Sequence, residues 1–386
     1  MEIKRIIENQ LKDKLFKEKV VILYGPRRVG KTTLVKKIAR EYNGKYFLCE
    51  EPDIMAALTR KTSTEMKKFL GDAKLIVLDE AQKITDIGTS LKLLVDNFPE
   101  TQIIATGSSS FDLANKVNEP LTGRNWEFHL YPFSLGELIG AVGALEAKRL
   151  LNYFLIYGFY PEVVNSDNDR LDILEKITND YLFRDVLAYE GVRKPMVLKK
   201  ILKALALQVG SQVSYTEIAG KIEASRNTVA TYIEILEKMF IIFRLPPLTK
   251  RKRDEIKIMN KIYFYDNGIL NTLLQNYNMP ENRKDIGSLF ENFYIAEKMK
   301  QRDYGKIQNS PYFWRTKDGQ EIDYIEEYRS GEEYKLFECK YTQGKPFVSA
   351  RFSEVYGQYP VKVITRENVV EELVGYANSG NEIYNK

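Results

Sequence analysis

The sequence predicts a multidomain α/β protein whose N-terminal domain is built on a parallel sheet. Strand-like and helix-like segments alternate through residues 1–145, which is the signature of a parallel sheet covered by helices. The chain has 386 residues, more than one ordinary domain. After residue 145 the pattern changes, first to helices and then to paired strands, so we expect further domains there.

The composition is that of a soluble globular protein, with 44% hydrophobic and 29% charged residues. No segment approaches the ~18 uncharged apolar residues of a membrane-spanning helix. The first residues are charged throughout and lack the apolar core of a signal peptide, so we expect a cytoplasmic protein without a membrane partner. The two cysteines, Cys49 and Cys339, lie in separate apolar runs, which indicates a reducing compartment and no cysteine metal site. The single histidine, His129, excludes a His-pair metal site within one chain, and we expect a structural role for it.

The stretch from residue 20 to 40 is the most informative part of the chain. An apolar run, Val20 to Tyr24, is followed by Gly25-Pro-Arg-Arg-Val-Gly30-Lys31-Thr32 and then by a helical pattern. Gly-x-x-x-x-Gly-Lys-Ser/Thr between a strand and a helix is typical of a phosphate-binding loop, whose backbone N–H groups point at a triphosphate. The sequence therefore predicts ATP and Mg²⁺ as cofactors. The residues expected around the nucleotide are Gly25, Pro26, Arg27, Arg28, Val29, Gly30, Lys31, Thr32 and Thr33.

Within this loop, we expect Lys31 to reach the β- and γ-phosphates and the Thr32 hydroxyl to bind Mg²⁺. Gly25 and Gly30 allow a tight turn where a Cβ atom would crowd the phosphates. The alternative is a glycine-containing turn with an incidental lysine. The strand before the loop and the helix after it disfavour that alternative.

A second motif follows in KLIVLDEAQK, residues 74–83. Leu75 to Leu78 form a buried strand, and Asp79 and Glu80 come at its carboxyl end, where ligands gather in open α/β sheets. We expect Asp79 to hold Mg²⁺ and Glu80 to polarise the attacking water. The alternative is an ordinary charged strand end, which the phosphate-binding loop upstream disfavours.

Two further candidates lie in the same domain. The strand TQIIATGSSS ends in Thr106 and Ser108, either of which could sense the γ-phosphate; a Ser/Thr-rich turn is the alternative. Arg124 lies in a Thr-Gly-Arg turn and could act as an arginine finger in its own subunit or in a neighbouring one, which would imply a homo-oligomer. The alternative is a salt-bridged loop arginine.

Six motifs, in this order, carry a resemblance to a known family: GPRRVGKTTL, LIVLDEAQ, ATGSSS, LTGR, YPFSLGEL and YGFYPEVV. Together they resemble the AAA-type P-loop ATPases of bacteria and archaea that carry a C-terminal region of unknown function. The resemblance implies four domains: a P-loop AAA-type ATPase core at 1–145, a helical lid at 146–195, a winged helix-turn-helix at 196–283 and a nuclease-like α/β domain at 284–386.

Residues 196–245 themselves predict a winged helix-turn-helix. Three amphipathic helices are expected there, the second with Ser214 as N-cap and Glu217 completing a capping box. Two strand-like runs would form the wing. Its expected tip is the basic run Lys250, Arg251, Lys252 and Arg253. That tip would contact the phosphates of a nucleic acid without reading its sequence, or would be a solvated end of a protein-packing domain.

The C-terminal third has the predicted element order α-β-β-β-α-β and resembles the restriction-endonuclease-like core. The resemblance implies a divalent cation held by Asp323 and Glu338, with Lys340 stabilising charge and Glu291 as a supporting ligand. Ile322 stands where that family often has proline. A core that has lost catalysis and only binds or packs is the alternative.

The leading functional hypothesis is a Mg²⁺-dependent ATPase that acts on a nucleic acid, DNA more than RNA. Two alternatives remain open. One is a Mg²⁺-dependent nuclease gated by the ATPase, and the other is a nucleotide-switched module that binds a partner protein. The net charge of +5 permits a nucleic-acid partner but does not argue for one.

Overall fold

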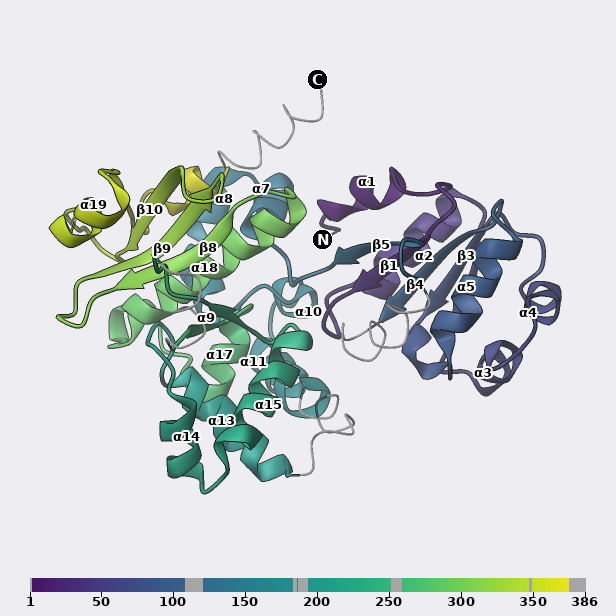
Figure 1. The fold of residues 1–386 in the computed structure, drawn as a ribbon, viewed down its shortest axis with the longest axis horizontal. Coiled ribbons are helices and arrows are strands. Elements are labelled where there is room, and N and C mark those ends of the chain that lie inside the picture. Colours follow the sequence, from purple (N-terminus) through teal and green to yellow (C-terminus); the bar gives the residue numbers. More distant parts are fainter. Residues whose placement is uncertain are drawn as a thin grey trace. The chain divides into compact units, whose positions relative to one another are not determined.

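The structure, a computed structural model, describes residues 2–107, 121–182, 186, 194–250, 259–346 and 349–374. The chain divides into two compact units (Figure 1). One comprises Lys4–Tyr131 together with Lys238–Phe240, and we call it the P-loop unit. The other comprises Met1–Ile3, Pro132–Glu237 and Ile241–Lys386, and we call it the C-terminal unit.

The P-loop unit is built on a parallel sheet, as the alternating pattern predicts. Its strands, within the described part of the chain, are β1 (Val20–Tyr24), β2 (Lys45–Leu48), β3 (Leu75–Asp79), β4 (Gln102–Gly107) and β5 (Asn125–His129). They lie in the order β2-β3-β4-β1-β5, and every pair is parallel. All residues of β1, β3 and β4 are buried, which explains their nearly continuous apolar runs.

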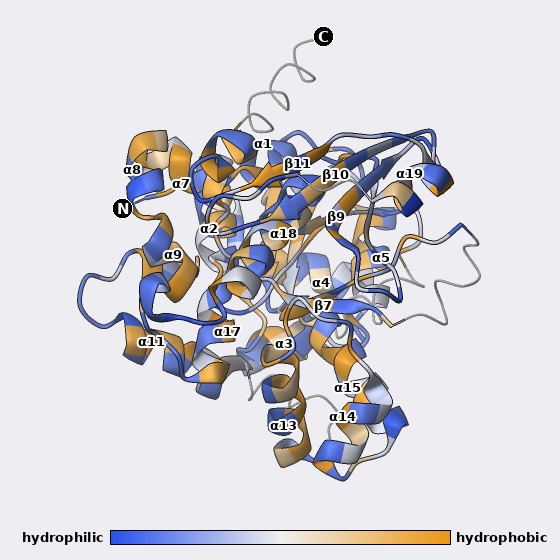
Figure 2. Cartoon of the chain, turned by 90° about the vertical axis from the view of Figure 1, so that its left-hand side faces the viewer, coloured by the Kyte–Doolittle hydropathy of each residue, from blue (hydrophilic) through white to orange (hydrophobic). Residues whose placement is uncertain are grey.

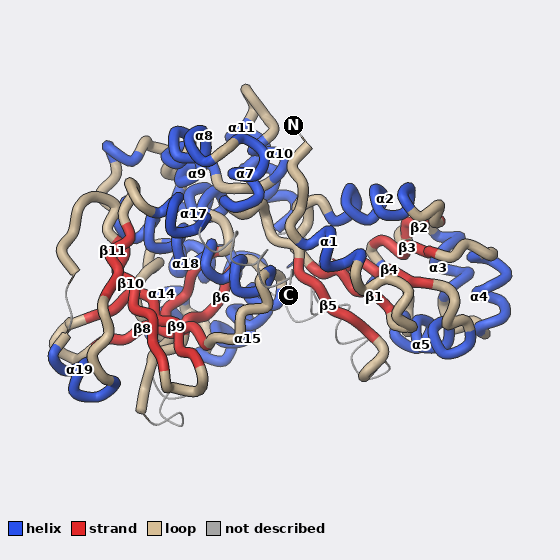
Figure 3. Tube along the Cα trace, turned by 90° about the horizontal axis from the view of Figure 1, so that it is seen from above, coloured by secondary structure: helices blue, strands red, loops and turns tan. Residues whose placement is uncertain are grey.

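Helices cover both faces of this sheet. They are α1 (Ile7–Lys12), α2 (Lys31–Glu41), α3 (Pro52–Leu58), α4 (Ser63–Leu70), the short η1 (Ala81–Lys83) and α5 (Ile87–Asn97). The connections β1–α2–β2 and β3–α5–β4 run in opposite directions across the sheet. Right-handed crossovers therefore place α2 and α5 on opposite faces, as Figure 3 shows.

The C-terminal unit begins with short helices. They are α7 (Leu135–Val142), α8 (Ala144–Arg149), α9 (Leu151–Tyr157), α10 (Pro161–Val164), α11 (Arg170–Lys176) and η2 (Ile177–Leu182). Helix α7 starts with a full capping box between Ser134 and Glu137.

The predicted helix–turn–helix segment follows. It comprises α13 (Pro195–Ala206), α14 (Tyr215–Ile222) and α15 (Arg226–Lys238), and then the antiparallel strands β6 (Ile242–Leu245) and β7 (Lys261–Phe264). Ser214 accepts the N–H of Glu217 as expected. In Figure 2 these helices alternate between apolar and polar colouring, in keeping with one buried and one exposed face.

The last part of the chain is an α/β layer in the predicted element order. Helices α17 (Asn267–Leu274), η3 (Pro280–Asn282) and α18 (Ile286–Tyr304) precede β8 (Ser310–Arg315), β9 (Glu321–Tyr328) and β10 (Glu333–Cys339). Helix α19 (Ala350–Tyr356) and β11 (Val361–Ile364) complete it. In the described residues the sheet order is β11-β10-β9-β8, with β10 and β11 parallel and the other pairs antiparallel.

The expected boundaries at residues 146, 196 and 284 fall inside the C-terminal unit. Buried asparagines explain why these segments form one body. Asn267 and Asn271 of α17 both donate to Leu155 O of α9, and Asn292 of α18 donates to Asn267 Oδ1 at 2.8 Å. Such side-chain links to buried backbone are costly to break. No helix in the described ranges is long and apolar enough to span a membrane.

Candidate functional site

The phosphate-binding loop lies between β1 and α2, at the carboxyl edge of the parallel sheet. Gly25 is required because a Cβ atom there would be 2.1 Å from Leu130 O on the neighbouring β5 segment. Gly30 has φ +95°, a conformation that favours glycine. The predicted glycine positions are thus explained by the backbone itself.

Lys31 is buried at the start of α2, and its Nζ donates to Gly25 O at 2.6 Å and to Pro26 O at 2.9 Å. The ammonium group therefore reaches back over the loop. Arg27 Nη2 lies 3.9 Å from Oε1 of Glu50, a residue that follows β2. The remaining predicted loop residues differ in exposure: Pro26 and Val29 are buried, while Arg28 and Thr33 are exposed.

The two predicted nucleotide motifs meet at Asp79. The Thr32 hydroxyl donates to Asp79 Oδ2 at 2.7 Å, joining the start of α2 to the end of β3. The Tyr46 hydroxyl of β2 donates to the same oxygen at 2.7 Å. The Thr106 hydroxyl of β4 donates to Asp79 Oδ1. Hydroxyl groups from three neighbouring elements thus fix a buried carboxylate.

Glu80 is held in an unusual backbone conformation beside this carboxylate. Its φ of 56° is left-handed, which costs a non-glycine residue ~1 kcal/mol and often marks functional sites. Its N–H donates to the Thr106 hydroxyl at 3.1 Å, and its side chain accepts from Gln82 Nε2. Thr106 therefore contacts both acids and orients them. Ser108, the other candidate for γ-phosphate sensing, lies outside the described residues.

The site environment keeps its neutral hydroxyl and thiol groups protonated. Burial raises the pKa of Tyr46, and the hydrogen bond to Asp79 and the charges of Asp79 and Glu80 add to that effect. Burial, together with the charges of Asp79 and Glu80, raises the pKa of Cys49 to about 12. Tyr46 therefore remains a hydrogen-bond donor at neutral pH.

Sequence reasoning missed two residues of this site, Tyr46 and Arg5. Arg5 is 7% exposed and donates to Val29 O of the loop at 2.8 Å and to Tyr131 O after β5 at 2.6 Å. Neither residue belongs to a motif with a spacing rule, because each reaches the site only through the fold.

Arg124 lies at the opposite edge of the sheet from the loop of its own chain. It immediately precedes β5, whose first residue pairs with Val20 at the start of β1. Strand β1 has five residues, so the Cα atoms of its first and last residues are ~13 Å apart. Arg124 Nε pairs with Asp96 Oδ1 at 2.7 Å on the surface. This placement gives no support to a role of Arg124 in its own subunit, and a role in a neighbouring chain stays a prediction.

The predicted residues of the C-terminal domain form an ionic cluster. Asp323 Oδ2 accepts the N–H of Cys339 at 2.8 Å, and Lys340 Nζ pairs with Glu338 Oε1 at 2.9 Å. Glu291 of α18 pairs with Lys261 Nζ at 3.0 Å and accepts the Tyr263 hydroxyl at 2.6 Å.

This cluster does not fit the predicted divalent cation. Among the residues that the structure describes, no three His, Cys, Asp or Glu side chains are placed to hold a metal ion. The carboxylates instead bind ammonium and N–H groups of the chain itself. The expectation of a Mg²⁺ site at Asp323 and Glu338, supported by Glu291, therefore finds no support in the geometry.

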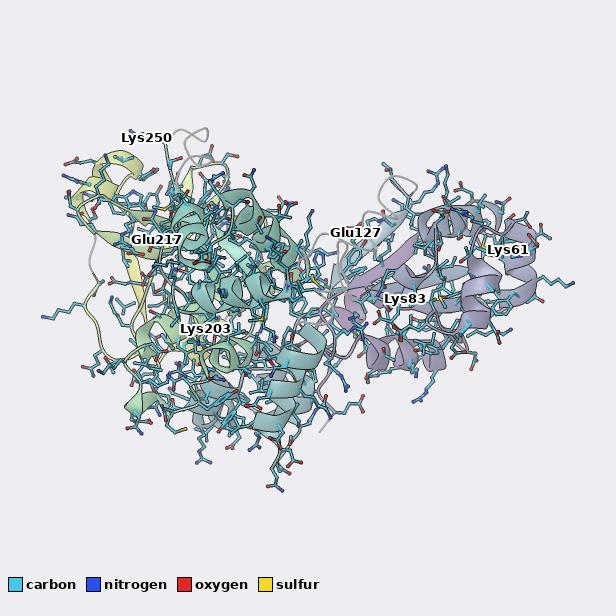
Figure 4. All side chains as sticks on the ribbon, turned by 90° about the horizontal axis from the view of Figure 1, so that it is seen from below. Lys61, Lys83, Glu127, Lys203, Glu217 and Lys250 are labelled. Carbon is cyan, nitrogen blue, oxygen red and sulfur yellow. The ribbon has the colours of Figure 1, made fainter. Side chains whose placement is uncertain are left out.

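The predicted basic tip is only partly described. Lys250 is exposed, while Arg251, Lys252 and Arg253 lie outside the described residues. Helix α13 adds three exposed lysines, Lys199, Lys200 and Lys203. Figure 4 labels Lys203 and Lys250, both on the C-terminal unit.

Comparisons with known proteins agree with the geometry of the loop. Residues 17–139 match the family described as AAA domain. Residues 286–372 match a domain of unknown function (DUF4143), and residues 148–279 match another (DUF8612). A protein of Mycobacterium tuberculosis, described as uncharacterized, is 31% identical over 343 residues, which cover 86% of this chain and 73% of the relative. The chain belongs to the AAA family with a C-terminal DUF4143 domain.

Other similarities of this AAA protein are more distant. The replication factor C large subunit of Sulfurisphaera tokodaii is 32% identical over 155 residues, 38% of this chain and 31% of the relative. A solved structure of Drosophila ORC bound to DNA covers 64% of this chain and 86% of its own, with 11% identity and a TM-score of 0.23. AAA domains are generally ATPases.

Proposed function

We propose that this AAA protein is a Mg²⁺-dependent ATPase that couples ATP hydrolysis to action on a nucleic acid. The observation that supports ATP hydrolysis is the hydrogen bond from the Thr32 hydroxyl to Asp79 Oδ2. It brings the hydroxyl of the phosphate-binding loop and the acid of the second motif to one point. A hydroxyl and a carboxylate side by side are the oxygen ligands that Mg²⁺ takes in P-loop ATPases.

The residues around this point have distinct roles. Backbone N–H groups of the loop and the Lys31 ammonium would bind the phosphates, and Thr32 and Asp79 would hold Mg²⁺. Mg²⁺ held there by Thr32 and Asp79 would supply positive charge to the phosphate oxygens. Glu80 would orient the attacking water and accept its proton. Thr106 and Tyr46 act by fixing Asp79, and they need not touch the nucleotide.

Three features support the nucleic-acid part. The basic run begins at the exposed Lys250, two residues after Leu248, whose N–H donates to Phe313 O of β8. Helix α15 begins with the exposed Arg226 and Asn227 at the end of a helix–turn–helix. The relative named replication factor C large subunit is, by name, a replication protein. Basic side chains on such elements would bind phosphates with little sequence preference.

The element order of the last domain supports a restriction-endonuclease-like fold without its chemistry. Helix α18, three antiparallel strands, α19 and β11 follow in the expected order. Since the carboxylates are engaged by the chain itself, we do not propose a nuclease. The domain would pack against the β6–β7 hairpin and would contribute to nucleic-acid binding without cleaving the nucleic acid.

The experiment is an ATPase assay of the purified protein with Mg²⁺, alone and with single- or double-stranded DNA. Lys31→Ala should abolish ATP binding. Glu80→Gln should bind ATP but hydrolyse it at least ~10²-fold more slowly, because the base is lost while the loop remains. Glu80→Gln with unchanged turnover would contradict the role of Glu80.

The DNA arm tests the coupling separately. We expect DNA to raise turnover and the effect to decline steeply with salt, because phosphate contacts release counterions. ATPase activity that no DNA or RNA alters, with a protein that co-purifies in an ATP-dependent way, would instead support the protein-binding module.

A further inference from the structure

Lys261, the first residue of β7, is completely buried in the C-terminal unit. Its Nζ lies 3.0 Å from Glu291 Oε1 of α18 and is also paired with Glu321 of β9. The same Nζ lies 5.4 Å from the ring centre of Phe313 on β8. One ammonium group is therefore enclosed by three elements of the last domain.

The charges around Lys261 keep it protonated. Burial alone would lower the pKa of Lys261, but the carboxylates of Glu291, Glu321 and Asp323 outweigh this effect and raise it. Glu321 and Asp323 are two residues apart on β9 and therefore share a face of the strand. Lys261 is therefore a buried cation with acidic neighbours on two elements, α18 and β9.

Other carboxylates of the cluster also have partners within the chain. Asp323 accepts a backbone N–H, Glu338 pairs with Lys340, and Arg315 lies 3.5 Å from Glu321. Buried charges are stable only when they are paired in this way.

We propose that the Lys261 ammonium is the resident cation of this cluster, in place of a divalent metal, and that the cluster fastens the β6–β7 hairpin to the C-terminal sheet. Lys261 and Tyr263 both lie on β7, and both bind Glu291. Strand β7 is thus joined to α18 through Glu291 and to β9 through Glu321. This inference concerns the C-terminal domain and does not depend on ATP hydrolysis.

The test measures thermal unfolding and Mn²⁺ binding of nucleotide-free protein, in EDTA and then in excess Mn²⁺. The wild type should show the same midpoint in both solutions and no Mn²⁺ uptake that depends on Asp323. Lys261→Met leaves several carboxylates without their cation, so its midpoint in EDTA should fall by about 10 °C. Mn²⁺ should restore most of that loss, because it can replace the ammonium. Lys261→Met/Asp323→Asn should lose the restoration.

Lys298→Met is the matched control. Lys298 is an equally buried lysine of the same domain, paired with Glu326 at 2.9 Å but away from Asp323. This variant should also be destabilised, yet Mn²⁺ should not restore it. Equal Mn²⁺ responses of the two variants would overturn the proposal.

The wild-type measurement decides the question even if Lys261→Met does not fold. A Mn²⁺ ion bound by the wild type and lost in Asp323→Asn, or DNA cleavage lost in that variant, would show that the cluster is a metal centre after all.

Discussion

At the scale of single residues, each unit contains a buried carboxylate, and the partners of the two differ. Asp79 is surrounded by hydroxyl donors, whereas Asp323 lies among other acids. Burial, and next the negative charge of Glu291, raise the pKa of Asp323 to about 7, although Lys261 and the Cys339 N–H act in the opposite direction. Asp323 is therefore a group that changes charge near neutral pH.

This raised pKa predicts a pH-dependent stability. The folded state retains a proton that the unfolded chain, with its ordinary value of 3.8, has already released. The favourable contribution is complete below the unfolded pKa and is lost as the pH rises through about 7. Asp323→Asn removes this loss and can still accept the Cys339 N–H. The free energy of unfolding of the variant, relative to wild type, should therefore increase between about pH 5 and about pH 8. Denaturant unfolding at several pH values measures this free energy. If the difference between variant and wild type did not change with pH, the raised pKa of Asp323 would be wrong.

At the scale of elements, the N-terminal segment supports the phosphate-binding loop. Glu8 of α1 is buried and pairs with Lys12 at 2.8 Å and with Lys37 of α2 at 3.1 Å. Arg5, just before α1, donates hydrogen bonds to Val29 O in the loop and to Tyr131 O after β5. The segment thus joins the loop and α2 to the chain after β5, about 100 residues further along the sequence.

We expect Arg5→Ala to weaken both stability and nucleotide binding. It removes two hydrogen bonds from a charged donor to buried carbonyls, worth about 3 kcal/mol together. The KM for ATP should rise more than kcat falls, since Arg5 positions the loop without touching the reacting atoms. Steady-state kinetics and chemical unfolding measure both effects. Lys4→Ala, at an exposed neighbouring residue, is the control and should change neither.

At the scale of the whole molecule, we predict that Arg124 acts in a neighbouring chain. It lies at the sheet edge opposite its own loop and is 42% exposed in its surface pair with Asp96. An arginine finger supplied by a neighbouring subunit raises turnover by ~10³-fold or more. Such a role would make hydrolysis depend on a homo-oligomer.

Mixing two inactive variants tests this role. Arg124→Ala keeps the ATP-binding loop but lacks the arginine. Lys31→Ala keeps the arginine but should not bind ATP. If the finger acts between chains, the mixture should recover ATPase activity that neither variant shows alone. Arg124→Ala with normal turnover would mean that Arg124 only forms the pair with Asp96.

The sequence by itself determined the P-loop unit. Its five strands, its glycine positions and the two motifs that contain Lys31, Thr32, Asp79 and Glu80 follow from local patterns, because each motif is a short run at the end of a strand. The element order of the last domain was predicted for the same reason. Each strand and each motif is formed by residues that are neighbours in the sequence.

Only the tertiary structure decided which distant groups meet. Arg5 and Tyr46 reach the nucleotide motifs through the packing of the P-loop unit, and Arg124 falls at the far edge because β5 runs parallel to β1. Lys261 reaches Glu291 and Glu321 from another segment, which changes the predicted metal site into an ionic cluster. The physical reason is that a buried charge is stabilised by whatever partner the fold brings within a few ångströms, and no local pattern in the sequence names that partner.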